Sequence, residues 1–115
     1  MVASASSYPL SPKEEIVLGA VAASAKGRKK VHGYPLAQEI AELRPRHFSM
    51  NYATLYRVLN RLEAQGYLNS EVAKPGTYPG RSRRSYGVSP AGRKVLRKSE
   101  VAVKRDENGE LYIEF

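Results

Sequence analysis

The clearest hydrophobic pattern in the chain lies between Tyr52 and Gln65. Four apolar residues recur there at the i, i+3, i+4, i+7 spacing that places them on one side of an α-helix, namely Leu55, Val58, Leu59 and Leu62. Asn51 can cap the first turn through its side-chain oxygen, and Gly66 can end the helix in a left-handed conformation. The pattern predicts one amphipathic helix whose opposite side faces outward.

Two further helices are predicted upstream. The first starts at residues 11–14, Ser-Pro-Lys-Glu, where a serine cap, a proline in the first turn and a glutamate three residues after the cap favour a helix that runs to about Ala25. The second opens at residues 32–35, His-Gly-Tyr-Pro, and ends at Arg44-Pro45, because proline disfavours helical geometry in the residue before it. Its buried side is expected to contain Leu36, Ile40 and Leu43.

Strand patterns surround the amphipathic helix. Residues 46–50 alternate, with Phe48 and Met50 on one side, and predict a short strand. After the helix, residues 67–73 and 85–88 alternate on either side of the turn-rich segment 74–80. They predict a hairpin with a long tip, on or near which lie three arginines, Arg81, Arg83 and Arg84.

The C-terminal part shows a helix pattern and then an ambiguous tail. Ser89-Pro90 starts a fourth helix, expected over residues 90–105, with an apolar seam of Val95, Leu96, Ala102 and Val103. In the tail, Asn108-Gly109 is a strong hairpin turn signal. Folding about that turn would place Leu111, Ile113 and Phe115 opposite Asp106, Lys104 and Ala102, which is a poor match. An extended tail that packs on the rest of the chain is therefore expected.

The predicted element order indicates the fold class. Helix, helix, short strand, helix, two-stranded hairpin and helix make the chain α+β, mostly α, and a helix followed at once by a basic hairpin is the winged form of the helix-turn-helix. The expected divisions are a flexible N-terminal arm at 1–10, a winged helix domain at 11–89, a C-terminal helix at 90–105 as a candidate dimerisation element, and an acidic and apolar tail at 106–115.

Charge narrows the class of partner. The 115 residues carry a net charge of +8, and residues 106–115 contribute four acidic and no basic groups. Residues 1–105 therefore carry 19 basic and 7 acidic groups, a net charge of +12. Such a domain attracts polyanions, of which nucleic acid is the commonest. No apolar run is long enough to span a bilayer and residues 1–10 lack the features of a signal peptide, so no membrane partner and a cytoplasmic, nucleoid-associated location are expected.

The outward side of the helix at 51–65 has side chains suited to a DNA major groove. Arginine and asparagine match guanine and adenine edges, which makes Arg57 and Asn60 the candidate base readers. The hairpin at about 74–85 would lie on the backbone or the minor groove. The full set of candidate DNA contacts is Asn51, Tyr52, Ala53, Thr54, Tyr56, Arg57, Asn60, Arg61, Tyr34, Lys29, Lys30, Arg81, Arg83 and Arg84.

Each candidate also has a structural interpretation. The helix would be an ordinary surface helix if its arginines were merely solvated, and Lys29 and Lys30 would belong to a solvated loop. Thr54 is as well suited to closing the cap with Asn51 as to binding a phosphate. Tyr56 lies at the margin of the apolar stripe and can pack there while its hydroxyl binds a phosphate.

Other classes of function find little support. The chain has no cysteine, and its two histidines, His32 and His47, are fifteen residues apart, so no metal site and no cofactor are expected. There is no phosphate-binding loop of the Gly-x-x-x-x-Gly-Lys-Ser/Thr type, and no nucleophile and base can be placed on one face. The chain is not expected to be an enzyme. The alternative to DNA binding is a non-catalytic winged-helix adaptor for a protein or RNA partner.

Three segments resemble the PadR-like transcriptional regulators. They are His-Gly-Tyr at 32–34, the run Ala-Thr-Leu-Tyr-Arg-Val-Leu-Asn-Arg-Leu-Glu-Ala-Gln-Gly-Tyr-Leu at 53–68, and Arg-Arg-Ser-Tyr-Gly-Val-Ser-Pro-Ala-Gly at 83–92. The resemblance implies a homodimeric repressor that binds a pseudo-palindromic operator and is released by a small hydrophobic or aromatic effector. It also implies that residues around 51–61 contact the operator and that the wing arginines hold its backbone.

The chain departs from this family at its C-terminal end. Family members dimerise through C-terminal helical structure, whereas the C-terminal end of this chain is expected to hold only a short fourth helix and an acidic tail. The absence of tryptophan excludes a pocket that holds a flat drug between indole rings.

Overall fold

The computed structural model describes residues 10–25, 30–72 and 84–115. Its elements in chain order are α1 (Pro12–Ser24), β2 (Val31–His32), α2 (Gly33–Ala41), the 3₁₀ helix η1 (Arg46–Phe48), α3 (Tyr52–Ala64), β3 (Leu68–Val72), β4 (Arg84–Val88), α4 (Pro90–Lys98), β5 (Ala102–Arg105) and β6 (Leu111–Glu114). The prediction of a mixed, mainly helical winged fold is confirmed.

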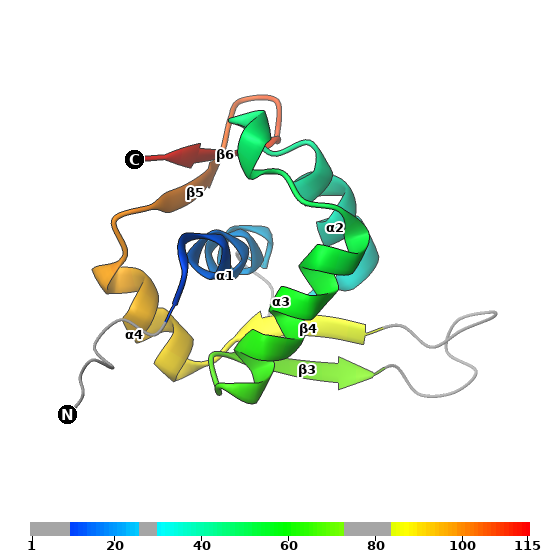
Figure 1. Ribbon diagram of the computed structural model, residues 1–115, viewed down its shortest axis with the longest axis vertical. Helices are drawn as coiled ribbons and strands as arrows, with labels where there is room; N and C mark the ends of the chain where they lie inside the picture. Colours follow the sequence, from blue (N-terminus) through cyan, green and yellow to red (C-terminus); the bar gives the residue numbers. More distant parts are fainter. Residues whose placement is uncertain (1–9, 26–29, 73–83) are drawn as a thin grey trace.

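Helix α1 lies in the middle of the molecule, with α2, α3, α4 and the C-terminal strands around it (Figure 1). Its residues from Ile16 to Val21 are all buried, which a helix achieves when its surface is apolar on every side. The predicted capping box is confirmed. The Ser11 hydroxyl accepts from the Glu14 N–H at 3.2 Å, and the Glu14 carboxylate accepts from the Ser11 N–H at 2.8 Å.

A three-stranded antiparallel sheet of order β2-β4-β3 forms the wing. The register runs from Leu68 opposite Val88 to Val72 opposite Arg84, which confirms the predicted hairpin strands. Val31 pairs with Tyr86 at the other edge of β4. Strand β2 has only two residues, too few to show an alternation of apolar and polar positions, so the sequence pattern did not predict it.

The predicted strand at 46–50 is wrong. Residues 46–48 form the 3₁₀ helix η1, in which the Phe48 N–H donates to the Pro45 carbonyl at 3.0 Å. Two alternating apolar residues do not make a strand without a neighbour to pair with, and tight i to i+3 bonds are an alternative for a short connection. Helix α2 also ends earlier than predicted, at Ala41, although Leu43 is fully buried as expected.

The fourth helix was predicted too long. Helix α4 ends at Lys98, and Ala102 and Val103 belong to β5 instead. At the end of the helix the Ser99 hydroxyl accepts from the Val101 N–H at 3.1 Å. A serine side chain that bonds the nearby backbone in this way competes with helix continuation.

The prediction of an unpaired tail is also wrong, because β5 and β6 form an antiparallel hairpin. Its turn holds one more residue than the predicted loop. The Asp106 N–H donates to the Glu110 carbonyl at 2.9 Å, and Gly109 has a φ of 83°. The extra residue shifts the register by one, so that Val103 pairs with Ile113 and both pack against the core.

Candidate nucleic-acid interface

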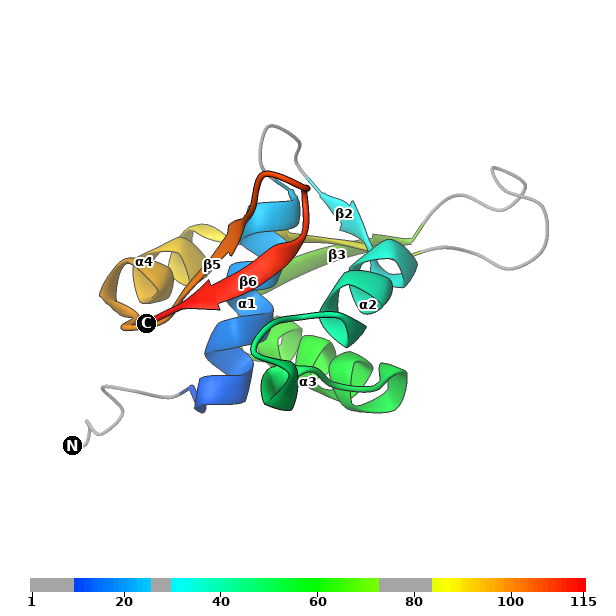
Figure 2. The ribbon, with the colours of Figure 1, turned by 90° about the horizontal axis from the view of Figure 1, so that it is seen from above.

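Helix α3 lies along one edge of the molecule (Figure 2). Asn51 caps it as predicted, since its side-chain oxygen accepts from the Thr54 N–H at 2.8 Å. The predicted stripe of Leu55, Val58, Leu59 and Leu62 is buried. Gly66 has a φ of 86°, in the left-handed region expected after the helix.

The opposite side of α3 faces outward. Its exposed residues include the predicted contacts Asn51, Tyr52, Ala53, Arg57, Asn60 and Arg61, whereas Thr54 and Tyr56 are half-buried. Within the part of the chain that the structure describes, Arg57 and Asn60 make no hydrogen bond or ion pair through their side chains. These two side chains can therefore meet a ligand without breaking an existing contact among the described residues.

Aromatic rings gather at the N-terminal end of α3. The ring centroids of Tyr34 and Tyr52 are 6.5 Å apart and those of Tyr52 and Tyr56 are 4.7 Å apart, both edge-on. The Tyr52 hydroxyl donates to the Tyr56 hydroxyl at 3.4 Å. Burial is the largest cause, and this hydrogen bond the second, of a rise in the pKa of the Tyr56 phenol above its usual value of 10.0.

Gly33 makes room for this aromatic group. A Cβ at that position would lie 2.2 Å from the Tyr56 hydroxyl oxygen and 3.0 Å from its ring. The His-Gly-Tyr segment therefore has a packing role: its glycine allows a ring from α3 to sit against the start of α2. Tyr34 next to it is 59% exposed and Tyr52 is 52% exposed, so both rings reach the surface.

Arg61 has a partner inside the protein. Its Nε lies 3.0 Å from Oε2 of Glu14, a carboxylate of α1 whose residue is only 5% exposed. The sequence pattern placed Arg61 on the flank of the outer face and did not reveal this ion pair, because Glu14 is 47 residues away in the chain. Contact of Arg61 with DNA stays a prediction, and the structure adds a role in joining α1 to α3.

Replacing Arg61 with alanine is expected to lower the free energy of unfolding by about 1–2 kcal/mol, because the buried carboxylate of Glu14 would lose its counter-ion, although the exposed guanidinium limits the effect. Urea denaturation measures this change. Arg57→Ala, one turn earlier on α3, is the matched control and should change stability by less than about 0.5 kcal/mol. Equal stability of the two variants would contradict the structural role of Arg61.

At the base of the wing, cations pair with carboxylates. Lys30 Nζ lies 3.0 Å from Glu71, and Arg84 donates to the Ser70 hydroxyl at 3.0 Å and lies 3.7 Å from Glu63. Arg84 is thereby attached to the C-terminal part of α3, which spacing alone could not have indicated. The other predicted basic contacts, Lys29, Arg81 and Arg83, lie outside the described residues.

Among residues 10–25, 30–72 and 84–115, no group of three or more His, Asp or Glu side chains is placed to hold a metal ion. Across the same ranges, every helix is too short or too polar to cross a membrane.

The fold and the exposed helix beside a wing define a winged helix-turn-helix protein. The chain belongs to the PadR-like family of transcriptional regulators, whose model matches residues 23–98. The resemblance found in the sequence is thereby confirmed, and the family is one of transcriptional regulators and not of enzymes. Over 76 residues it is 41% identical to the transcriptional regulator Rv3488 of Mycobacterium tuberculosis, an alignment that covers 65% of this chain. It spans 64% of that relative's length.

Solved structures of transcriptional regulators have a similar fold. Bacillus subtilis PadR in complex with operator DNA matches 78% of this chain and 47% of its own, with a TM-score of 0.62 and 18% identity. A transcriptional regulator from Clostridium thermocellum matches 85% of this chain and 84% of its own, with a TM-score of 0.57 and 21% identity. A PadR family regulator from Eggerthella lenta matches 72% and 66%, with a TM-score of 0.53 and 29% identity.

Proposed function

We propose that this protein regulates transcription by binding double-stranded DNA, with α3 in the major groove. The observation that carries the proposal is the exposed face of α3, where Arg57 and Asn60 stand free of partners among the described residues. A similar fold in Bacillus subtilis PadR is described in complex with operator DNA, which supports the same mode of binding here.

The residues of this face take different parts in the proposed complex. Arg57 reads a guanine edge and Asn60 an adenine edge, since these pairs match in donors and acceptors. The hydroxyls of Tyr34 and Tyr52 and the N-terminal turn of α3, from Asn51 to Thr54, face phosphates, which fix the position of the helix. Ala53 allows close approach to the groove. Further phosphate or minor-groove contacts come from Lys29, Lys30, Arg81, Arg83 and Arg84.

The chain acts in this proposal as a homodimer and a repressor in the cytoplasm. A helix-turn-helix dimer on a pseudo-palindromic operator holds its two recognition helices one helical turn of DNA apart, about 34 Å. A small hydrophobic or aromatic effector would release it. The family to which the chain belongs supports this assignment, and the net charge of +8 favours a polyanionic partner.

The test is to select duplexes from a random pool with the full chain and to titrate one selected duplex and its scrambled version at two salt concentrations. We expect two protomers per selected duplex, a preference for it of about 1,000-fold or more, and affinity that falls steeply with salt. Equal binding to both duplexes would overturn sequence-specific recognition. No binding to either, with retention of a protein or RNA partner, would favour the adaptor.

A further inference from the structure

The β5–β6 hairpin lies outside the segment that the family model matches, which ends at residue 98. It packs beside the connection between α2 and α3 (Figure 1). The Ile113 N–H donates to the Arg44 carbonyl at 2.9 Å, and Arg44 forms a parallel bridge with Tyr112. Strand β6 is therefore bonded to β5 on one edge and to the helix-turn-helix connection on the other.

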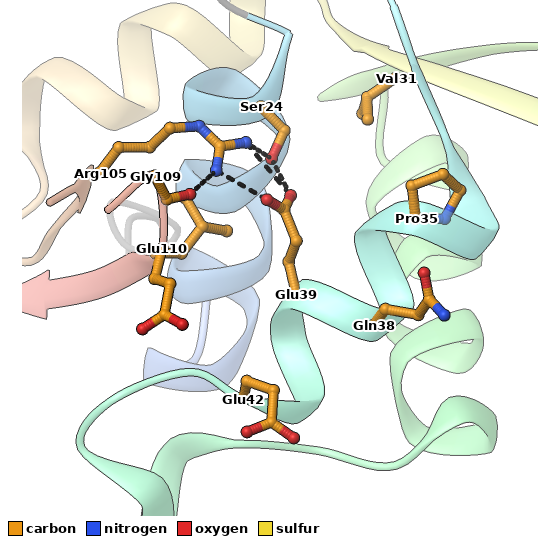
Figure 3. A pocket seen from close by; sticks show the side chains of 10 residues that line it. Ser24, Val31, Pro35, Gln38, Glu39, Glu42, Arg105, Gly109 and Glu110 are labelled. Atoms are coloured by element: carbon orange, nitrogen blue, oxygen red, sulfur yellow. Dashed lines mark hydrogen bonds and ion pairs between the residues drawn. The ribbon is translucent and has the colours of Figure 1, made fainter. Parts of the chain in front are cut away.

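An ion pair joins the hairpin to α2. Arg105 Nη1 lies 2.6 Å from Oε2 of Glu39 and Nη2 lies 3.2 Å from Oε1, a two-point contact between planar groups (Figure 3). The Ser24 hydroxyl at the end of α1 donates to the same carboxylate at 3.0 Å, and Arg105 also donates to the Gly109 carbonyl at 2.5 Å. The pair lies in the wall of a cavity of about 450 Å³ between α2 and the hairpin turn.

A second set of polar contacts joins the turn of the hairpin to Arg44. The Asp106 carboxylate accepts from the Asn108 and Glu110 N–H groups, each at 2.9 Å, and pairs with the Arg44 guanidinium. The Glu110 N–H, and then the Arg44 guanidinium, hold the pKa of Asp106 below its usual value of 3.8. The same carboxylate thus organises the turn and attaches it to Arg44, three residues after the end of α2 in the α2–α3 connection.

Apolar contacts complete the attachment. Leu111 is 2% exposed and Ile113 is 6% exposed, and both belong to the core cluster that also holds Leu43. The Phe115 ring centroid lies 5.6 Å from that of Phe48, which is in η1 and three residues before the cap of α3. Polar and apolar contacts of the hairpin therefore fall on Glu39 near the end of α2, on Arg44 in the α2–α3 connection and on η1.

We propose that the β5–β6 hairpin is a clamp that fixes the α2–α3 connection and so positions the recognition helix, with Arg105 as a positioning residue. The clamp itself is a property of the free protein. Its effect on DNA binding rests on the proposed function. A helix that reads bases must be held in one orientation, because small displacements break hydrogen bonds to base edges. In this chain, some of the residues that hold the recognition helix lie in the hairpin, outside the residues that the family model matches.

Amide hydrogen exchange of the free full-length protein tests the clamp. Two reporters are the Ile113 N–H, bonded to the Arg44 carbonyl, and the Leu55 N–H, bonded to the Asn51 carbonyl in the first turn of α3. In Arg105→Ala we expect exchange at both to rise about fivefold, since a charge-assisted pair that is partly exposed contributes modestly. Amides of the β3–β4 pair should not change.

Lys104→Ala is the matched control. It removes the same charge from the same strand, but Lys104 pairs at 2.5 Å with Glu114 inside the hairpin and not with α2. In this variant the exchange rate of the Leu55 N–H should equal that in the unaltered protein. The charge swap Glu39→Arg with Arg105→Glu keeps the net charge and should restore exchange at both reporters.

A rise at Ile113 without a rise at Leu55 would overturn the clamp, and so would an equal rise at β3–β4 or a failure of the swap to restore either reporter. Titration with a selected duplex is the second measurement, in which Arg105→Ala should weaken binding about threefold to tenfold and Lys104→Ala should not. If the unaltered protein binds no duplex, the proposed function fails while the exchange result still decides the clamp.

Discussion

Arg57→Ala should weaken binding to a selected duplex by roughly 5- to 150-fold, the equivalent of about 1–3 kcal/mol, and leave binding to a scrambled duplex much less affected. Arg57 is exposed on the outer face of α3, one turn after Ala53 and nearly one turn before Asn60. Removal of its side chain would leave a guanine edge without its donor. A bidentate contact of this kind discriminates between bases, whereas a phosphate contact does not.

The measurement is a titration of the variant against both duplexes at two salt concentrations. Arg93→Ala on α4 is the control, because it removes the same charge from an exposed helical position. It should lower affinity slightly and equally for the two duplexes. Equal losses on both duplexes for Arg57→Ala would show that this side chain holds the backbone and reads no base.

Gly92→Ala should destabilise the fold by about 1–3 kcal/mol, because overpacking at a rigid position is costly. At an exposed position inside a helix, replacement of glycine by alanine normally stabilises a protein by about 1 kcal/mol. Gly92 lies in α4 but is buried. Here a Cβ would lie 2.3 Å from the Tyr67 carbonyl oxygen and 2.8 Å from Val88 Cγ1. The carbonyl cannot move freely, since it accepts from the Ser89 N–H at 3.1 Å.

Thermal unfolding checks this expectation, with a decrease in Tm of roughly 5–15 °C for a domain of this size. Arg93→Ala, at the next position of the same helix and exposed, should shift Tm by no more than about 3 °C. A Tm for Gly92→Ala equal to or above that of the unaltered protein would show that α4 packs less closely on the α3–β3 turn than the structure describes.

Local signals in the sequence predicted the elements well where they act over a few residues. Ser11 with Glu14, and Asn51 with the stripe after it, specify helix starts through contacts three or four residues apart. The same short range explains the failures. Nothing near Arg46 shows that a 3₁₀ turn is preferred to a strand, and the one-residue shift of the β5–β6 register depends on one extra residue in the turn that contains Gly109.

The candidate interface divides in the same way. The exposed positions of Arg57 and Asn60 follow from helical periodicity, because the buried stripe fixes which side faces outward. The ion pair of Arg61 with Glu14 does not follow from periodicity, because it forms only when α1 packs against α3. Nor could spacing indicate that Glu63 and Ser70 hold Arg84 at the base of the wing.

The sequence by itself therefore determined the class of the protein, its winged order of elements, the limits of α3 and the side of that helix that faces outward. These depend on periodicity, capping and motifs, which are interactions between near neighbours in the chain. Only the tertiary structure decided which arginines are already paired, which neighbours a side chain at Gly33 or Gly92 would meet, and that the C-terminal segment is a hairpin attached to the α2–α3 connection. Those features arise from contacts between residues far apart in sequence, which periodicity and capping do not report.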